Sequence, residues 1–320
     1  MNRQELISEV RQTLTNAGFY VSEVCSMRPT GFDLVARRDN SLLIIKVLTN
    51  INAISEDVAN EIRTLSILLK GCPILIGENK GAGLLEDDVV YDRFGLQAIS
   101  YKTLKNHLLE GIPLEVYAAP GGLYVNLDEE KIKRYRKEQD ISLGSFARSL
   151  RVSRRTVQMY EEGMNASIEM AFRIENLLGK DVTTPIDILR KPVIKEEKLL
   201  KNIPSEGPKN FQQEIFSLLE NLGYKVVPLE RSPFEAVSQD EKKILLTCVD
   251  RYDKKLLRKA HVVSSISRIT EKQAVLITDK EGKKTNIEGT PLVVKKELKK
   301  TGSPKELLEL ILERLYEKGK

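Results

Sequence analysis

Two short helical patterns meet at a three-residue turn within the stretch LGSFARSLRVSRRTVQMYEEG, residues 143–163. The first pattern has apolar residues at the spacing of one helix face: Leu143, Phe146, Ala147 and Leu150. Because a serine before a helix can satisfy a free backbone N–H, Ser142 and Ser153 are expected to cap the two helices. Val157 and Tyr160 then face inward. The stretch therefore predicts two crossing helices, the second with a polar face toward solvent.

Helical patterns on both sides of this stretch complete a small all-α domain. Upstream, residues 129–138 form a third pattern with Ile132 and Tyr135 facing inward. Downstream, a fourth pattern has apolar residues at helical spacing: Ile168, Ala171, Ile174 and Leu178. Four or five short helices around one core are expected.

The segment from Leu127 to Asp181 resembles a helix-turn-helix (HTH) domain of the Cro/C1, or lambda-repressor-like, type. The run RVSRRTV, residues 151–157, followed by YEEG, residues 160–163, carries most of the likeness. In such domains the turn often holds a glycine where this chain has Arg151. A residue other than glycine can adopt a positive φ there only at an energetic cost, so the turn is expected to be slightly reshaped.

The same resemblance implies one structural ion pair and one DNA-reading helix. Such domains pair an Arg of the first helix with a Glu late in the recognition helix, and Arg136 and Glu161 occupy these positions. The recognition helix, here residues 153–162, enters the major groove of DNA. Arginine there can bind guanine bidentately, for about 1–3 kcal/mol of discrimination per contact. The residues expected to contact DNA are Ser153, Arg154, Arg155, Thr156, Gln158, Met159, Arg148, Arg151 and Lys131.

The basic residues of this segment have an alternative interpretation as a merely solvated face. The charge distribution favours DNA, because nine Lys and Arg residues between 131 and 155 are opposed only by Glu138 and Asp140. The phosphate backbone attracts such a face whatever the base sequence.

Composition limits the other functions that the chain can have. Its 320 residues and formal charge of +5 allow two or three domains with a mild basic excess. No apolar run approaches the ~18 residues of a membrane span, and the N-terminus reads as a helix rather than a signal peptide. We therefore expect a cytoplasmic protein. Its three cysteines are isolated and its histidines are few: Cys25, Cys72, Cys248, His107 and His261.

These residues predict neither a metal centre nor a histidine-based catalytic site. Residues 77–83 contain three glycines but have the wrong spacing for a phosphate-binding loop, so they are interpreted as a surface loop. No cofactor is expected, and the sequence does not reveal whether the protein has a small-molecule effector.

The flanks of the helical domain align with each other. Residues 6–19 parallel 211–224, residues 31–35 parallel 233–237, and residues 41–47 parallel 243–249. The tract 74–76 likewise parallels 275–277, and 95–104 parallels 289–298. We interpret this as a diverged duplication. Each copy is expected to run helix, three strands, helix, two strands, helix, with continuous apolar strands at 42–48 and 244–249 buried on both faces of a helix-covered sheet.

This order resembles the restriction-endonuclease-like fold. Its nucleases place one acid at a strand end and an acid-x-Lys on the next strand, to hold Mg²⁺ and position the attacking water. Glu9, Asp33 and Lys46 occupy suggestive places, but Ile44 stands where the second acid belongs. If these residues have no catalytic role, Lys46 is expected to be a strand-end residue that reaches solvent, and Asp33 a strand-edge or turn residue. The second copy keeps acids at the matching positions, Glu214 and Glu235. Leu246 and Cys248 stand where the second acid and the lysine of the motif belong. The chain is accordingly not expected to be an enzyme.

The fold class is thus α/β plus all-α: two diverged nuclease-like domains, residues 1–118 and 209–320, flank the HTH domain at 127–182. Pro120-Gly121-Gly122 ends the N-terminal part, and residues 183–208 are expected to form an exposed linker. The complete order resembles a family of archaeal transcriptional regulators with one Cro/C1-type domain in mid-chain.

The expected function is that of a sequence-specific DNA-binding regulator, with double-stranded DNA as its partner and a homodimer as its assembly. Two recognition helices about 34–36 Å apart would meet successive major grooves of a pseudo-palindrome, with the flanking domains setting the spacing. Two alternatives remain. One is a structure-selective, Mg²⁺-dependent nuclease using Asp33 and Lys46, and the other is a protein-interaction scaffold resembling a bridging factor.

Overall fold

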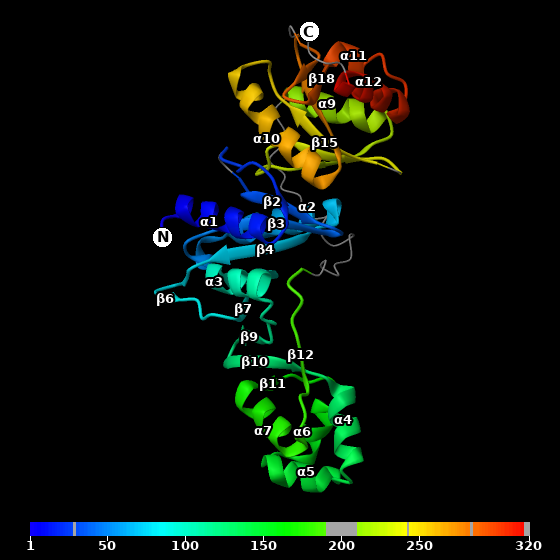
Figure 1. Cartoon of the computed structure of the whole chain (residues 1–320). Helices are drawn as coiled ribbons and strands as arrows, with labels where there is room; N and C mark the ends of the chain where they lie inside the picture. The colour runs from blue at the N-terminus through cyan, green and yellow to red at the C-terminus, as the bar shows by residue number, and fades with distance from the viewer. Residues whose placement is uncertain (28–29, 190–209, 242, 282–283, 317–320) are drawn as a thin grey trace. The chain divides into compact units, whose positions relative to one another are not determined.

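The computed structural model describes residues 1–27, 30–189, 210–241, 243–281 and 284–316 (Figure 1). The chain forms two compact units. We call residues 1–2, 48–53 and 75–188 the first unit, and residues 3–47, 54–74 and 189–320 the second unit.

The N-terminal part of the second unit begins with a helix and a small antiparallel sheet. Its elements are α1 (Arg3–Asn16), β1 (Tyr20–Val21), β2 (Leu34–Arg38), β3 (Ser41–Val47) and α2 (Glu56–Leu69). β2 pairs with both β1 and β3. All of β3 after Ser41 is buried, as its continuous apolar run predicts. Ser55 caps α2 by accepting the N–H of Val58.

The C-terminal part of the second unit is an α/β sandwich. Its elements are α9 (Asn210–Asn221), β13 (Lys225–Pro228), β14 (Ala236–Gln239), β15 (Ile244–Val249), α10 (Lys254–Thr270), β16 (Gln273–Thr278), β17 (Asn286–Ile287), β18 (Thr290–Val294), α11 (Lys295–Leu298) and α12 (Pro304–Tyr316). The strand order is β13-β14-β15-β16-β18-β17, and β15, β16 and β18 run parallel.

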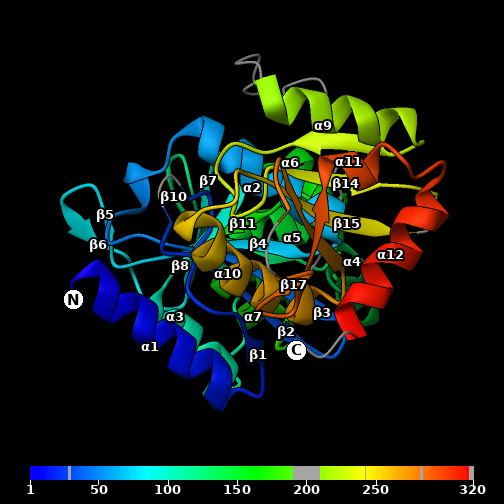
Figure 2. The same cartoon turned by 90° about the horizontal axis from the view of Figure 1, so that it is seen from above.

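Helices cover both faces of this sheet, so β15 is buried along nearly its whole length. α9, α11 and α12 pack on the face that carries Leu245 and Val249. α10 contacts β16, β17 and β18 from the other side, as Figures 1 and 2 show. The predicted strand at 244–249 is confirmed. This part differs from the predicted order in two ways: three strands instead of two follow α10, and the helix α12 is additional.

The two α/β parts share one backbone detail that supports the proposed duplication. The N–H of Asp33 donates to the carbonyl of Ile45 at 2.8 Å, and the N–H of Glu235 donates to the carbonyl of Thr247 at 2.9 Å. These two acids are paired in the sequence alignment of the copies. The second nuclease-like domain itself stays a prediction.

The first unit joins strands to the helical domain. Outside that domain's helices its elements are β4 (Cys72–Gly77, from Leu75 on), β5 (Asn79–Lys80), β6 (Gly83–Leu84), β7 (Val89–Arg93), β8 (Leu96–Ser100), α3 (Tyr101–Lys105), a π-helical turn (Asn106–Glu110), β9 (Val116–Ala119), β10 (Gly122–Leu127), β11 (Ala166–Ser167) and β12 (Thr183–Thr184). Within this unit the strand order is β8-β7-β9-β10-β11, and β12 pairs with β10.

Two expected boundaries differ from the structure. Pro120 and Gly121 form the hairpin turn between β9 and β10, and Gly122 is the first residue of β10, so the strand pairing continues through this segment. Gly121 and Gly122 both have a positive φ, which glycine adopts readily. The expected linker begins with ordered chain, since Thr183 and Thr184 form β12; its residues 190–208 lie outside the described residues.

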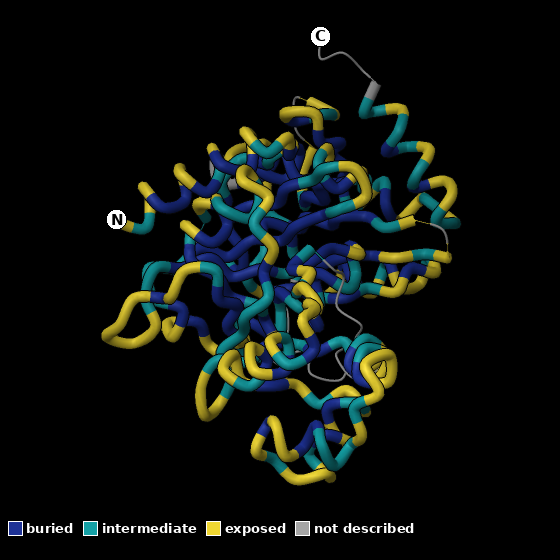
Figure 3. Tube along the Cα trace, turned by 60° about the horizontal axis from the view of Figure 1, so that its bottom comes forward, coloured by how far each residue is buried: buried dark blue, intermediate teal, exposed yellow. Residues whose placement is uncertain are grey.

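Burial follows these elements along the chain (Figure 3). Buried positions run through the strands, whereas exposed positions gather on the outer turns of helices and on loops. Within the described part of the chain, no helix is both long enough and apolar enough to cross a membrane.

Candidate nucleic-acid interface

Four capped helices form the helical domain. They are α4 (Glu129–Glu138), α5 (Leu143–Leu150), α6 (Arg154–Tyr160) and α7 (Ile168–Leu178). In each helix the capping side chain accepts the N–H three residues further on: Asp128, Ser142, Ser153 and Ser167. The predicted caps Ser142 and Ser153 are confirmed. α6 is shorter than the expected helix at 153–162, because Ser153 is its N-cap and Glu161 is its C-cap.

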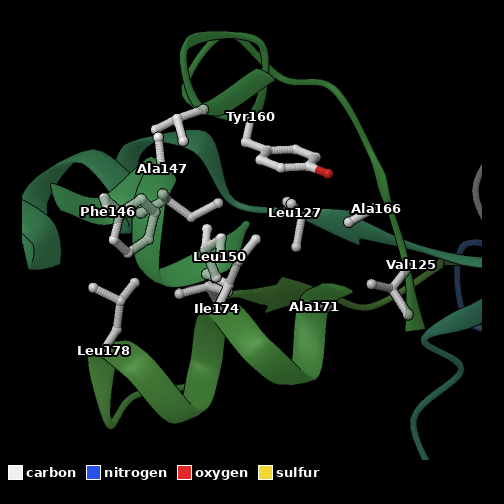
Figure 4. Packing of buried hydrophobic residues seen from close by; sticks show 13 residues of the cluster. Val125, Leu127, Phe146, Ala147, Leu150, Tyr160, Ala166, Ala171, Ile174 and Leu178 are labelled. Atoms are coloured by element: carbon white, nitrogen blue, oxygen red, sulfur yellow. The ribbon is translucent and has the colours of Figure 1, made fainter. Parts of the chain in front are cut away.

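The core of this domain fixes how α6 is presented. Phe146, Leu150 and Ile174 meet between α5 and α7 (Figure 4), and each is at most 1% exposed. Val157 and Tyr160 of α6 join the same cluster, as predicted. Each such side chain stabilises the fold by about 1.5–3 kcal/mol when fully buried. The apolar face of α6 is therefore held inward and its polar face is left outside.

One core prediction for α7 is wrong. Ile168 is 41% exposed, although its spacing from Ala171 and Ile174 predicts an inward side chain. It is the first residue of α7, directly after the cap Ser167. The apolar stripe of α7 therefore begins one turn later.

The turn between α5 and α6 depends on Arg151. This residue has φ 58° and ψ 42°, and its N–H donates to the carbonyls of Ala147 and Arg148 at the end of α5. Arg151 thus adopts the left-handed conformation that a glycine often supplies in such turns, and the slight reshaping expected from the sequence is not seen in its dihedral angles. An arginine there costs more than a glycine because its Cβ crowds the backbone.

A buried ion pair ties α4 to the end of α6. Nε of Arg136 donates to Oε1 of Glu161 at 2.6 Å, and Nη2 donates to Oε2 at 3.1 Å. Nη1 also donates to the carbonyl of Ile141 at 2.9 Å. Both side chains are only 9% exposed, so this pair sets the position of α6 and does not face a ligand.

Most of the predicted contact residues lie exposed on α5, on α6 and in the turn between them. Ser153, Arg154, Arg155, Gln158, Met159, Arg148 and Arg151 are exposed. Thr156 is half-buried and shares a hydrogen bond with the hydroxyl of Ser153. Lys131 is also half-buried, with its Nζ 3.7 Å from Oδ2 of Asp128. Ser153 has a second role that limits its freedom, because its hydroxyl already caps α6.

The two arginines at the start of α6 differ in their surroundings. Arg155 is 70% exposed, and its Nη1 lies 3.8 Å from Oε2 of Glu162, which is itself 61% exposed. Such an exposed pair is weak and exchanges easily with another anion. The guanidinium of Arg154 instead lies against Gly144 in the first turn of α5. Sequence reasoning missed Gly144, although a glycine inside a helical pattern is a visible signal.

The N-terminal acid centre is occupied by the chain's own cations. Oδ1 of the buried Asp33 accepts Nη2 of Arg3 at 2.5 Å, and Oδ2 accepts the N–H of Val47 at 2.8 Å. Nζ of Lys46 lies 3.8 Å from Oδ2 and donates to the carbonyl of Thr30. Burial lowers the pKa of the Lys46 amine below its ordinary value, and the charge of Asp33 opposes this shift.

This burial corrects one expectation from the sequence. Lys46 is 7% exposed and does not reach solvent, and Asp33 is 1% exposed and lies at no open edge. Ile44, at the position of the absent second acid, is fully buried. The carboxylate of Asp33 is thus already paired with a guanidinium, and an apolar side chain stands where the second acid belongs.

The C-terminal part has a related centre with a different cation. Nζ of Lys259, from α10, hydrogen-bonds Oε1 of Glu235 and lies 3.8 Å from Oδ2 of Asp250. Oε2 of Glu235 accepts the N–H of Val249 at 2.8 Å, matching the Asp33–Val47 contact. Burial outweighs the nearby ammonium and raises the pKa of Glu235. Among the described residues, no group of three or more His, Cys, Asp or Glu side chains is placed to hold a metal ion.

Comparisons with known proteins agree with these two parts of the chain. The family model described as a PD-(D/E)XK superfamily domain matches residues 3–114, and the model described as Helix-turn-helix matches residues 132–184. The nuclease-like fold predicted for the N-terminal domain and the HTH domain are thereby confirmed. No solved structure matches the chain.

Proteins from several archaea match nearly the whole chain. A protein of Methanosarcina mazei is 40% identical, and one of Methanosarcina acetivorans is 39% identical. One of Haloarcula marismortui is 35% identical. Each alignment covers 98% of this chain and 98% of the relative, and each relative carries the assigned name HTH-type transcriptional regulatory protein. The chain therefore belongs to this archaeal family of HTH-type transcriptional regulatory proteins.

Proposed function

We propose that the protein is a sequence-specific DNA-binding transcriptional regulator that reads the major groove with α6. The observation that carries this proposal is the division of α6 into two faces. Val157 and Tyr160 anchor the helix in the core, while Arg155 and Gln158 stand exposed on its outer surface. Arginine can read guanine and glutamine can read adenine from such a position. The cytoplasm is the expected compartment, since an archaeal regulator meets its DNA there.

The candidate contact residues divide into those expected to contact DNA bases and those expected to contact DNA phosphates. Arg155 and Gln158 are assigned to base edges, with Met159 beside them. Arg148 is assigned to phosphate because it lies on α5, the first helix of the HTH motif, and that helix crosses the DNA backbone. Arg151 in the turn and Lys131 on α4 are assigned to phosphates as further basic residues of the domain. Binding is then expected to weaken steeply with salt, with a slope of about −0.9 per neutralised phosphate.

The first test compares one residue of each kind. Arg155→Ala is expected to lower the ratio of specific to nonspecific affinity by about 5- to 150-fold, because each bidentate base contact gives about 1–3 kcal/mol of discrimination. Lys131→Ala is expected to weaken binding to all sequences alike and to reduce the salt slope by about 0.9. The measurement is a salt series of affinities for a duplex selected from a random pool and for a scrambled duplex.

An unchanged specificity ratio in Arg155→Ala would show that α6 is not the reading helix. If Arg154 and Arg155 can both be removed without loss of a captured protein partner, and no DNA footprint exists, the scaffold alternative is favoured.

A homodimer is the assembly that we propose, with α7 at its two-fold axis. α7 exposes Phe172 (64%) and Ile168 (41%), and beside them Glu169 and Arg173 form an ion pair at 2.5 Å. An antiparallel crossing of two α7 helices makes this surface self-complementary. Phe172 meets Ile168 of the partner subunit, and Glu169 faces Arg173 of the partner subunit. α7 packs on the core from the side away from Tyr160 of α6 (Figure 4), so this interface leaves α6 open.

Phe172→Glu is expected to convert the dimer to a monomer at micromolar concentration and to weaken binding to a palindromic site about a hundredfold. The cause is a carboxylate placed in an apolar contact. Sedimentation measures the assembly, and Leu84→Glu is the matched control because Leu84 is an equally apolar side chain, 78% exposed, on β6. A Phe172→Glu dimer, or a monomeric parent chain, would contradict this interface.

We also propose that the N-terminal domain does not cleave DNA, in spite of its nuclease-like fold. Support comes from the Arg3–Asp33 pair and from Ile44 at the place of the second acid. The test is incubation with Mg²⁺ or Mn²⁺ and branched or nicked DNA. Cleavage that Asp33→Ala abolishes would establish the nuclease alternative.

A further inference from the structure

The guanidinium of Arg154 lies on a glycine of the neighbouring helix. A methyl group at Gly144 would lie 2.9 Å from Nη2, 3.1 Å from Nε and 3.2 Å from Cζ of Arg154. The first of these separations is shorter than real methyl contacts allow. An alanine at this position would therefore require the flexible end of the Arg154 side chain to move away from α5.

The backbone of α5 does not itself require a glycine here. Gly144 is the second residue of a regular helix, and its φ is not in the left-handed region. A glycine inside a helix is less stable than an alanine at the same place. Gly144 thus makes α5 locally less stable. In return, its missing side chain leaves room for the guanidinium of Arg154 against α5.

Arg154 is also free of competing carboxylates. Among the described residues, no Asp or Glu lies within ion-pair distance of it, whereas Arg155 has Glu162 as a neighbour. Because Arg154 leans onto α5, its guanidinium is on the side of the motif where the first helix crosses the DNA backbone. Arginine on that side binds phosphate and carries no base information.

We propose that Gly144 is a positioning residue that seats Arg154 for contact with a DNA phosphate, leaving base reading to Arg155 and Gln158. This inference rests on the proposed function. Arg154 then contacts a DNA phosphate and not a base. This contact would fix the depth and the register with which α6 enters the major groove.

The test is Gly144→Ala, which is expected to move folding and binding in opposite directions. The melting temperature rises, because alanine favours the helix. The affinity falls about tenfold for every DNA sequence, as expected for the loss of one charged hydrogen bond, and the salt slope falls by about 0.9. The ratio of specific to nonspecific affinity is unchanged. Ser149→Ala is the matched control, because Ser149 is an exposed residue of α5.

A double-mutant cycle shows whether Gly144 acts through Arg154. In an Arg154→Ala background, Gly144→Ala is expected to cause no further loss of affinity. An equal loss in both backgrounds, or an unchanged affinity in Gly144→Ala while Arg154→Ala binds weakly, would overturn the inference. A specificity ratio that drops in Arg154→Ala would also overturn it. If Arg154→Ala and Arg155→Ala both bind DNA as the parent chain does, the proposed function itself fails.

Discussion

Arg136→Ala is expected to destabilise the helical domain by about 3–5 kcal/mol, the usual cost of removing one partner of a buried ion pair. Glu161 is only 9% exposed and would lose both of its guanidinium hydrogen bonds. The carbonyl of Ile141 would lose a donor as well. Since a domain is stable by only about 5–15 kcal/mol, most of the stability of this one is at stake.

Hydrogen exchange in the full chain measures this effect domain by domain. Peptides from α4 to α7 are expected to lose protection, while peptides from β15 and β16 keep theirs. Arg134→Ala is the control, because its ion pair with Glu138 is exposed and contributes about 0.3–0.5 kcal/mol. Equal protection in Arg136→Ala and Arg134→Ala would show that the pair does not hold α6 in place.

The features that the sequence predicts well are those set by neighbouring residues. The caps Ser142 and Ser153 need only a hydroxyl three residues before a free N–H, so spacing alone predicts them. The strand at 244–249 follows from one apolar run. The pairing of Arg136 with Glu161 was implied by resemblance, since 25 residues separate the two in the chain.

The features that the sequence does not predict depend on contacts between distant segments. Spacing alone did not show that Arg3 would reach Asp33, or that Arg154 would lie on Gly144. Ile168 has the periodicity of a core residue, yet it stands at the start of a helix and is 41% exposed. Lys259 is the clearest case, because it meets Glu235 from a helix that the alignment of the two copies does not single out.

Lys259→Met is expected to destabilise the C-terminal domain by about 3–5 kcal/mol at neutral pH. The Lys259 side chain is 4% exposed and lies between the carboxylates of Glu235 and Asp250, which are 19% and 25% exposed. Methionine fills a similar volume but leaves the two acids facing each other without a cation. Arg258→Met, at an exposed position of the same helix, is the control and should change stability by less than about 0.5 kcal/mol. Hydrogen exchange of β15 and β16 measures both variants.

The pH dependence of this loss identifies its cause as charge. Burial raises the pKa of Glu235, and the ammonium of Lys259 opposes this shift. Removing that ammonium is therefore expected to raise the pKa of Glu235 further. A carboxyl whose pKa is higher in the folded state than in the unfolded state stabilises the fold when it is protonated. This contribution is fully present at a pH below the ordinary pKa of 4.5, and it is lost as the pH rises through the folded-state pKa. The deficit of Lys259→Met is therefore expected to shrink as pH falls toward 4.5. Adding Glu235→Gln should recover most of the loss at neutral pH, because the amide keeps an acceptor for the N–H of Val249 without the charge. A deficit that is the same at both pH values and persists in the double variant would mean that lost packing, and not an unpaired carboxylate, destabilises the domain.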